Sequence, residues 1–216
     1  KIERLITPKT KAIVPVHFAG HMCEMQKLES LARFSGLSII EDAAQAFGAS
    51  LNGKKAGSFS EAAGFSMNPM KALGGYGEAG VVVTNDDEIY ERLKRLRHAG
   101  TTSDPKKLIT NDCREISLNH KMDTINAALL LVALDAWPGS KRRREEIAYQ
   151  LNKELPLAIG RQEISPGEVH GRYVYPIQAG HRDALKEYME CNGIETKIMH
   201  EPLVPDAPAY QTYDAE

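Results

Sequence analysis

A lysine and an aspartate in two separate loops are the residues of this chain whose types and surroundings could do chemistry together. Lys71 lies in GFSMNPMKALGGYGEAG (64–80), where it follows Ser66 and precedes a cluster of glycines. Asp42 lies in EDAAQAFGA (41–49), directly after a short apolar run. A lone loop lysine is usually a solvated charge, but a lysine in a glycine-rich pocket beside an acid can present the neutral amine that imine formation requires.

This pair of residues suits one cofactor, pyridoxal 5'-phosphate (PLP). The pyridinium nitrogen of PLP needs an acidic partner, which Asp42 could supply, and its aldehyde needs a lysine. Ser66 and nearby backbone N–H groups could hydrogen-bond the phosphate, as helix starts and backbone nests do. Taken alone, Asp42 would more often be a helix N-cap, so the interpretation depends on Lys71.

The elements before these loops predict an α/β fold with a mostly parallel sheet. AIVPVH (12–17) and LSII (37–40) are typical of buried strands, and residues 24–35 between them have the apolar spacing of a helix. This order predicts a βαβ unit with parallel strands and a right-handed crossover. Because open parallel sheets bind ligands at the carboxyl ends of their strands, Asp42 is expected at the mouth of the sheet.

Two more short strands are predicted at 62–65 and 81–84. The second runs into a helix that is capped near Asn85 and continues through Arg97, with acids in its first turn. Glycine and proline punctuate residues 48–80 so densely that most of this interval is expected to be loop, where binding sites often lie.

A long helical pattern follows in the second half of the large domain. It begins near Asp123, and Pro138 with Gly139 is expected to interrupt it. A separate amphipathic helix is predicted at 140–155.

A change of domain is predicted near Pro156. Residues 1–155 are expected to form a large domain that binds the cofactor, and residues 156–216 a small α+β domain. The small domain is predicted to contain a strand at 172–178, a helix at 182–192 that stops at Gly193, and a strand at 195–198.

Composition and charge argue against several classes of protein. A formal net charge of -2 and a pI near 6.4 provide no basic field for nucleic acid. The three cysteines are widely spaced without a CxxC pair, which argues against a zinc or redox site. No apolar stretch approaches the roughly 18 residues of a membrane span, and the chain does not start with a signal-peptide pattern. A cytoplasmic protein with no metal, nucleic acid or membrane as partner is expected.

Several segments together resemble the DegT/DnrJ-type aminotransferases, a branch of the fold-type I PLP enzymes that act on nucleotide sugars. The segments are PVHFAG, IIEDAAQAFGA, GSFSEAAGFSMNPMKALGGYGEAG, VVVTNDDEIYERLKRLRHAG and ISLNHKMDTINAALL, and more loosely GIETK and PAYQ. The DAAQ segment followed by Ser-x-x-Pro-x-Lys is the specific signal. The resemblance extends over nearly the whole chain.

The resemblance implies a role for each of five residues. Lys71 would hold PLP as a Schiff base and move a proton between the substrate carbon and the cofactor. Asp42 would partner the ring nitrogen, Gln45 the phenolic oxygen and Ser66 the phosphate. Asn119 would reach the phosphate of the neighbouring subunit, which implies a homodimer with a shared active site. By residue type alone, Gln45 could instead cap the following turn, and Asn119 would more often be a loop or cap residue.

The implied reaction is a transamination in two half-reactions. Glutamate or a similar donor gives its amino group to PLP, which passes it to a nucleotide-linked keto-sugar. A PLP-dependent sugar dehydratase is an alternative, although such relatives replace the lysine that this chain retains as Lys71. A catalytically silent binding or regulatory protein on the same fold is another, because a fold does not define a function.

The chain departs from the family pattern at a few positions. Met67 and Met70 stand where many relatives have an aromatic residue and a Thr or Ser, and Val204 stands where many have a histidine, which puts substrate preference in doubt. His17 and His200 could shuttle protons or contact a sugar, but isolated histidines are more often structural.

The resemblance also implies that the chain is incomplete at both ends. Relatives have a long segment before PVHFAG that supplies a Gly-Thr phosphate loop and an aromatic residue that stacks on the PLP ring. The chain also ends inside the small domain, just after PAYQ. The 216 residues are therefore expected not to form a working site alone.

Overall fold

The computed structural model describes residues 1–102 and 112–210. By its internal contacts the chain divides into two compact units. The first unit comprises residues 1–155 and 162–176, and the second comprises residues 156–161 and 177–216. The chain first leaves the first unit at the predicted position, after Leu155, but residues 162–176, called the return segment below, rejoin it. The last residues of the predicted small domain, including the glutamine of PAYQ, lie outside the described residues.

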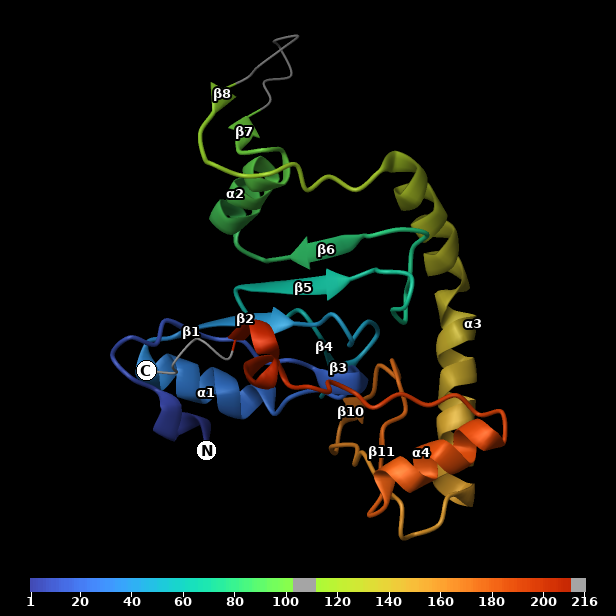
Figure 1. Cartoon of the computed structure of the whole chain (residues 1–216). Coiled ribbons are helices and arrows are strands. Elements are labelled where there is room, and N and C mark those ends of the chain that lie inside the picture. The colour runs from blue at the N-terminus through green and yellow to red at the C-terminus, as the bar shows by residue number, and fades with distance from the viewer. Residues whose placement is uncertain (103–111, 211–216) are drawn as a thin grey trace. The chain divides into compact units, whose positions relative to one another are not determined.

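The first unit is built on a four-stranded sheet in the order β1-β2-β5-β6 (Figure 1). The strands are β1 (Ala12–Ile13), β2 (Ser38–Asp42), β5 (Ala62–Ser66) and β6 (Gly80–Val83). The first three strands run parallel to one another, and β6 runs antiparallel to β5. The predicted α/β class with a mostly parallel sheet is therefore confirmed.

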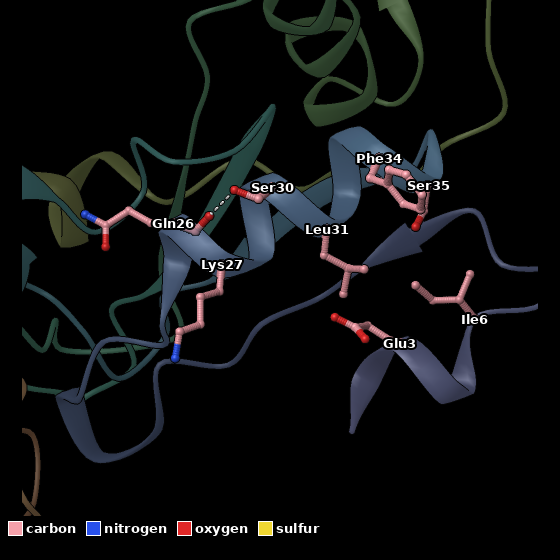
Figure 2. Close-up of a pocket in the computed structure, with 8 residues that line it drawn as sticks. All are labelled: Glu3, Ile6, Gln26, Lys27, Ser30, Leu31, Phe34 and Ser35. Carbon is pink, nitrogen blue, oxygen red and sulfur yellow. Dashed lines mark hydrogen bonds between the residues drawn. The ribbon is translucent and has the colours of Figure 1, made fainter.

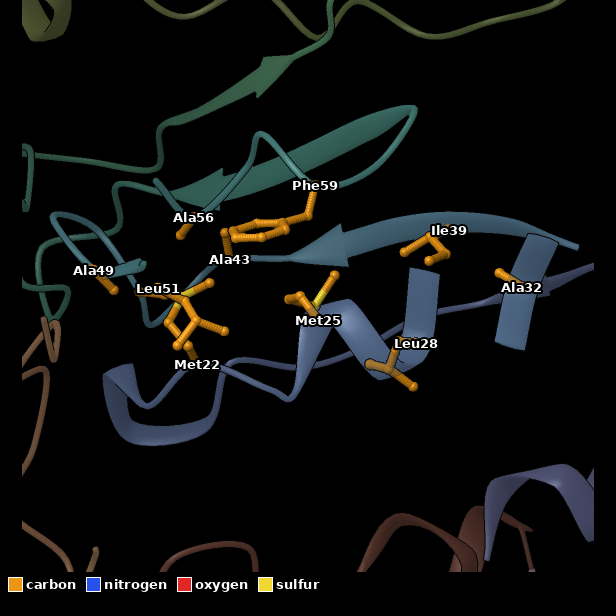
Figure 3. Packing of buried hydrophobic residues seen from close by; sticks show 11 residues of the cluster. Met22, Met25, Leu28, Ala32, Ile39, Ala43, Ala49, Leu51, Ala56 and Phe59 are labelled. Atoms are coloured by element: carbon orange, nitrogen blue, oxygen red, sulfur yellow. The ribbon is translucent and has the colours of Figure 1, made fainter. Parts of the chain in front are cut away.

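Helix α1 (Met25–Ser35) connects β1 to β2 and forms the predicted βαβ unit. Its buried residues Met25, Leu28 and Ala32 recur at helical spacing on one face. The helix ends at Gly36, whose φ of 63° is the left-handed conformation that glycine adopts without steric cost. Figure 3 shows this face packed against Ile39 of β2 in the main hydrophobic cluster.

The first predicted strand is shorter than expected, because Pro15 lacks the N–H that would continue the ladder. The residues after β1 nevertheless stay hydrogen-bonded to β2 as far as Asp42, the last residue of that strand. The carbonyl of Pro15 accepts from the Asp42 N–H at 2.9 Å, and the His17 N–H donates to the Asp42 carbonyl at 3.1 Å. These two bonds hold the backbone of Asp42 at the carboxyl edge of the sheet.

Helix α2 (Asp87–Arg97) follows β6, as predicted. Its N-cap is Asp86, one residue later than expected, whose side chain accepts from the Ile89 N–H at 2.9 Å. Two short strands, β7 (Thr101–Thr102) and β8 (Asp112–Cys113), pair antiparallel beyond it.

The expected break at Pro138 and Gly139 is wrong, because α3 (Thr124–Glu154) is one continuous helix. A proline inside a helix removes one backbone hydrogen bond and crowds the preceding turn. Contacts on both sides of Pro138 offset that cost. Trp137 is buried against Phe47, and Lys141 Nζ donates to the carbonyl of Gly48 at 2.9 Å.

The return segment belongs to the first unit because it adds a strand there. Strand β10 (Glu168–Val169) pairs antiparallel with β3 (Ser50–Leu51), which pairs with β4 (Lys54–Lys55). No pattern in the amino-acid sequence predicted this pairing, because strands of two residues carry no detectable period.

The described residues of the second unit form a two-stranded ladder and one α-helix. Strand β9 (Gly160–Arg161) pairs with β11 (Ile177–Gln178), and α4 (Arg182–Cys191) follows with Gly193 after it, as predicted. The strand expected at 172–178 is therefore limited to its last two residues, and the one expected at 195–198 is absent from the described residues. A strand needs a partner, and no described segment pairs with 195–198.

Short 3-10 helices are also present among the described residues. They are η1 (Ile2–Leu5), η2 (Phe18–Gly20), η3 (Val204–Asp206) and η4 (Pro208–Tyr210). Among the described helices, none is both long and apolar enough to cross a membrane.

Candidate active site at the carboxyl edge of the sheet

Asp42 and Ser66 lie at the carboxyl ends of two adjacent parallel strands. Asp42 is in register with Gly64 of β5, and Ser66 is two residues further along that strand. Because side chains two residues apart point to the same face of a strand, Asp42 and Ser66 share one face of the sheet. The sequence predicted this place for Asp42, and the pairing of β2 with β5 brings Ser66 to the same edge.

The carboxylate of Asp42 is half-buried, and only one of its two oxygens accepts a hydrogen bond from the described residues. Its Oδ1 accepts from the Ala44 N–H at 3.0 Å. In the part of the chain that the structure describes, no group donates to Oδ2. The N-cap alternative for Asp42 does not apply, because residues 43–48 form turns and no helix begins there. One oxygen therefore remains for a ligand.

Glu41 points to the opposite face and is a structural brace. Its two oxygens accept four hydrogen bonds, and its side chain is fully buried. The donors are His17 Nε2 at 2.9 Å and, each at 2.8 Å, the Gly57 N–H, the Phe59 N–H and Ser60 Oγ. Burial raises the pKa of Glu41, but the hydrogen bonds from His17 and the other donors outweigh it and lower the pKa.

His17 belongs to this brace. It is buried, and its Nδ1 accepts from the Cys23 N–H at 3.2 Å, so that Nε2 carries the proton donated to Glu41. It lies on the covered face with Glu41, on the opposite side of β2 from the Asp42 side chain. The structural interpretation of His17 fits this geometry. His200 lies in the second unit.

Gln45 ties the turn after β2 to the turn after β1. Its Oε1 accepts from the N–H of Ala19 at 2.7 Å. Ala19 has a φ of 61°, which is uncommon for a residue with a Cβ, so this bond stabilises a strained turn. Gln45 therefore does not cap the turn that follows it. It bonds across to a segment 26 residues away in the chain.

The loop after β5 makes a tight turn between Ser66 and Lys71. The Asn68 N–H donates to Ser66 Oγ at 3.4 Å, and the Lys71 N–H donates to the Asn68 carbonyl at 2.8 Å. The side chain of Lys71 is half-buried, and its Nζ lies 5.0 Å from the ring centroid of Tyr173. No described carboxylate forms an ion pair with Nζ, so the amine is available for chemistry.

A second hydrophobic cluster supports both loops. It joins Phe47, two residues after Gln45, to Leu73, two residues after Lys71. The cluster includes Leu130 and Trp137 of α3, and the Phe47 and Trp137 rings meet edge to face at 5.1 Å. The two loops are therefore positioned by one helix.

The two unusual methionines of the Lys71 loop have different surroundings. Met67 packs against this second cluster, whereas Met70 is 80% exposed. Met67 is half-buried and Met70 is largely open to solvent, so Met70 is the more accessible of the two to a ligand.

The glycine cluster after Lys71 is held by Asn126, which the sequence did not single out. Asn126 Oδ1 accepts from the Tyr76 N–H at 3.0 Å, and its Nδ2 donates to the Glu78 carbonyl at 3.4 Å. A Cβ on Gly75 would lie 2.6 Å from Asn126 Oδ1, which explains the glycine there. In the sequence, a polar side chain on an otherwise apolar helix face was the signal that could have identified Asn126.

The return segment packs against the same region. The Tyr173 N–H donates to the Ala19 carbonyl at 3.2 Å, and the Gly171 N–H to the Gly20 carbonyl at 2.7 Å. Arg144 of α3 donates from Nη1 to the Tyr173 carbonyl at 3.2 Å. Tyr173 therefore joins the site from a segment predicted only as a strand.

Three side chains of this region lie close enough to hold a metal ion. The possible ligand atoms of His21, Glu168 and His170 lie within 4.8 Å of one another. They already have partners, however. Glu168 accepts from the Met22 and Ser165 N–H groups, and the two nitrogens of His170 are engaged by Gln162 and the Arg172 N–H. The cluster is therefore better explained as a clasp that holds the return segment.

Asn119 stands apart from the other four predicted residues. It is exposed, forms an isolated antiparallel bridge with His98, and accepts from the Lys121 N–H at 3.3 Å. No contact links it to Asp42, and the local bond is that of a loop residue. Its role toward a neighbouring subunit stays a prediction.

A hollow between η1 and α1 lies away from these residues (Figure 2). It is lined from Glu3 and Ile6 on one side and by α1 residues from Gln26 to Ser35 on the other. None of the predicted site residues reaches it, so it has no part in the site.

Comparisons with known proteins give relatives for the whole chain. The sequence matches the DegT/DnrJ/EryC1/StrS aminotransferase family over residues 1–216. It is similar to a pleiotropic regulatory protein of Geobacillus stearothermophilus, at 38% identity over 93% of this chain and 53% of that protein. It is also similar to the dTDP-3-amino-3,4,6-trideoxy-alpha-D-glucose transaminase of Streptomyces venezuelae, at 36% identity over 97% of this chain and 54% of that protein.

A solved structure has the same fold. The crystal structure of S. venezuelae DesV in complex with a ketimine intermediate matches with a TM-score of 0.89 and 35% identity, over 97% of this chain and 56% of that one. The expected fold-type I aminotransferase fold is thereby confirmed. The chain spans about half the length of the curated relatives it matches.

Proposed function

The chain belongs to the DegT/DnrJ/EryC1/StrS aminotransferase family, and we propose that its protein is a PLP-dependent aminotransferase of nucleotide-linked keto-sugars with Lys71 as the lysine that carries the cofactor. One observation carries the proposal. Asp42 and Ser66 share one face at the carboxyl edge of one sheet, and Lys71 follows in the loop after β5, with its amine free of any described acidic partner.

The donor set at this edge fits PLP. The cofactor presents a pyridinium nitrogen, a phenolic oxygen, a phosphate and an aldehyde, and when bound it supplies a ring that withdraws electrons from the reacting carbon. The uncommitted Oδ2 of Asp42 suits the first of these groups, Ser66 Oγ the phosphate, and Lys71 Nζ the aldehyde. Each atom has at least part of its bonding capacity open.

The residues would then divide the chemistry among them. Asp42 would keep a proton on the ring nitrogen by its charge, which strengthens the electron withdrawal. Gln45 would donate from Nε2 to the phenolic oxygen, because its Oε1 is held by Ala19. Lys71 Nζ would carry the cofactor and, when released, move a proton at the substrate carbon.

The substrate class is proposed from the relatives. The S. venezuelae relative is named as a transaminase of a dTDP-linked amino sugar, and another relative, from Aneurinibacillus thermoaerophilus, as a dTDP-3-amino-3,6-dideoxy-alpha-D-galactopyranose transaminase. A keto-sugar on a nucleotide as acceptor and glutamate as donor follow as the proposal for this protein. A homodimer with Asn119 reaching across, and a cytoplasmic location, are part of the same proposal.

A regulatory role is the second candidate. The relative from G. stearothermophilus carries the name of a regulatory protein. Retention of Lys71 together with a free Asp42 oxygen favours catalysis, because a silent protein has no need of either. The same retention argues against a dehydratase that replaces the lysine.

Borohydride trapping tests the assignment of Lys71. The protein is incubated with PLP, reduced with borohydride and digested, and the pyridoxyl group is located by peptide mapping. The expected position is Lys71, and the label should vanish in Lys71→Arg and persist in Lys55→Arg, an exposed lysine of β4. A label on another lysine would refute the assignment.

A spectroscopic titration separates the enzyme from the regulatory protein. Adding glutamate to the PLP-loaded protein should shift the cofactor absorbance, and a following screen of nucleotide-linked 3-keto and 4-keto sugars should restore it. An absorbance that stays constant with glutamate and with other amino donors would favour the regulatory candidate.

A further inference from the structure

The ring of Tyr173 is the group that faces the amine of Lys71. Nζ lies 5.0 Å from the ring centroid, within the roughly 6 Å at which an ammonium is attracted to an aromatic face. We propose that Tyr173 is a positioning residue that holds Lys71 for its role at the cofactor. This proposal rests on the proposed function, because it concerns how Lys71 is held when it is not bound to a cofactor.

The backbone of Tyr173 is tied from two directions. Its N–H donates to the Ala19 carbonyl at 3.2 Å, and its carbonyl accepts from Arg144 Nη1 at 3.2 Å. The neighbouring Arg172 carbonyl accepts from the same Nη1 at 3.0 Å. A ring on a backbone restrained in this way offers a preorganised contact to a mobile lysine.

The same bonds connect Tyr173 to another predicted site residue. Ala19 receives the Tyr173 N–H at its carbonyl and donates its own N–H to Gln45 Oε1 at 2.7 Å. Ala19 adopts a φ of 61°, and its carbonyl and N–H are each used by one of these partners. Lys71, Tyr173 and Gln45 are thus linked through one residue of the turn after β1.

An aromatic face suits a lysine that must act both while it carries the cofactor and after it is released. A carboxylate in this place would form an ion pair and hold the charged amine firmly. The ring attracts the ammonium more weakly, takes no proton from it, and limits the directions that the long side chain can explore. Tyr173, whose backbone is bonded to the turn after β1, would therefore restrain the position of Nζ and still allow it to leave.

The contact can be tested without cofactor. Lysines of the protein are reductively methylated with carbon-13, and the Lys71 signal is assigned by its absence in Lys71→Arg. A ring at this distance should move that signal upfield in the wild type and in Tyr173→Phe, which keeps the aromatic face. The shift should be lost in Tyr173→Leu and kept in Tyr175→Leu, because the Tyr175 hydroxyl donates instead to Asn152 Oδ1 at 2.6 Å.

Kinetics then test the role. The rate of the half-reaction with the amino donor should fall by about 3- to 30-fold in Tyr173→Leu and recover in Tyr173→Phe, whereas Tyr175→Leu should stay near wild type. Circular dichroism of each variant confirms folding. A missing upfield shift, or a lost shift with an unchanged rate, would overturn the proposal even if the borohydride label falls on Lys71. A label on a different lysine would overturn the proposed function, whether or not the shift is present.

Discussion

The consecutive acids Glu41 and Asp42 have opposite surroundings, because successive side chains of a strand point to opposite faces of the sheet. Glu41 is enclosed by four donors on the covered face, and Asp42 keeps an oxygen free at the ligand edge. Glu41 therefore contributes to stability, and its neighbour Asp42 remains available for chemistry.

Replacing Glu41 by Gln should destabilise the protein. The amide introduces a donor opposite groups that already donate, and it removes a charge that four hydrogen bonds stabilise. A loss of about 2–4 kcal/mol in the free energy of unfolding is expected from such a buried network. Urea unfolding checks this, with Asp42→Asn as the matched control. Equal stability of the two variants would contradict the brace.

Replacing Asp42 by Asn should leave the fold and PLP binding intact and reduce the rate. A neutral amide cannot hold a proton on the ring nitrogen by charge, and preorganised charges of this kind contribute about 3–4 kcal/mol to the transition state. Turnover with glutamate and PLP affinity are measured side by side. A rate within about threefold of wild type would mean that Asp42 is only a turn residue.

At the scale of elements, α3 positions the two site loops. Its residue Trp137 lies against Phe47 and also against the backbone of Gly48. A Cβ on Gly48 would meet Trp137 Cζ2 at 2.9 Å, and Gly48 has a φ of 80°. The loop that carries Gln45 thus approaches the helix as closely as a glycine permits.

Replacing Gly48 by Ala should push this loop away from α3. The comparison is Gly53→Ala, where φ is also 80° but a Cβ would meet nothing within 4 Å. Gly53→Ala should cost only the strain of the backbone, about 1 kcal/mol, and Gly48→Ala about 1–3 kcal/mol more through overpacking. Thermal unfolding of both variants measures the difference. Equal losses would show that the contact with Trp137 is not tight.

At the scale of the whole molecule, the return segment is fastened by His170. The ring is buried, its Nδ1 accepts from the Arg172 N–H at 2.9 Å, and its Nε2 lies 2.9 Å from Gln162 Oε1. Burial lowers the pKa of His170, the positive charges of Arg172 and His21 lower it further, and the pKa falls to about 4. Glu168, bonded to His21, is the acid that faces the pair.

The free energy of unfolding should therefore fall in mild acid. A histidine whose pKa is lower in the folded state takes up its proton more readily in the unfolded chain. Its contribution is present above about pH 6.5 and is lost as the pH falls toward about 4, by about 3 kcal/mol. Denaturant unfolding measured across this pH range should show that the free energy of unfolding depends less on pH in His170→Asn than in the exposed control His120→Asn. The same pH dependence in both variants would exclude the cluster around His170 as the cause of the loss in stability.

The sequence by itself determined the parts of this protein that depend on near neighbours. The spacing of apolar residues in α1, the capping acids of α2 and the stop at Gly193 are encoded within a few residues, and the structure has each of them. The order of strands and helix also predicted that Asp42 would end a strand at the ligand edge. The resemblance to the aminotransferases rested on contiguous motifs and needed no tertiary information.

Tertiary structure decided which distant groups meet. Periodicity shows that Glu41 and Asp42 face opposite ways, but only the packing of α1 on one face of β2 buries the first and leaves the second free. Pro138 stays within α3 because Trp137 and Lys141 find partners in a loop about 90 residues earlier in the chain. Tyr173 reaches Lys71 because β10 pairs with β3, a contact between segments whose local sequence carries no trace of the other. Such contacts are stabilised only in the folded chain, so no local pattern predicts them.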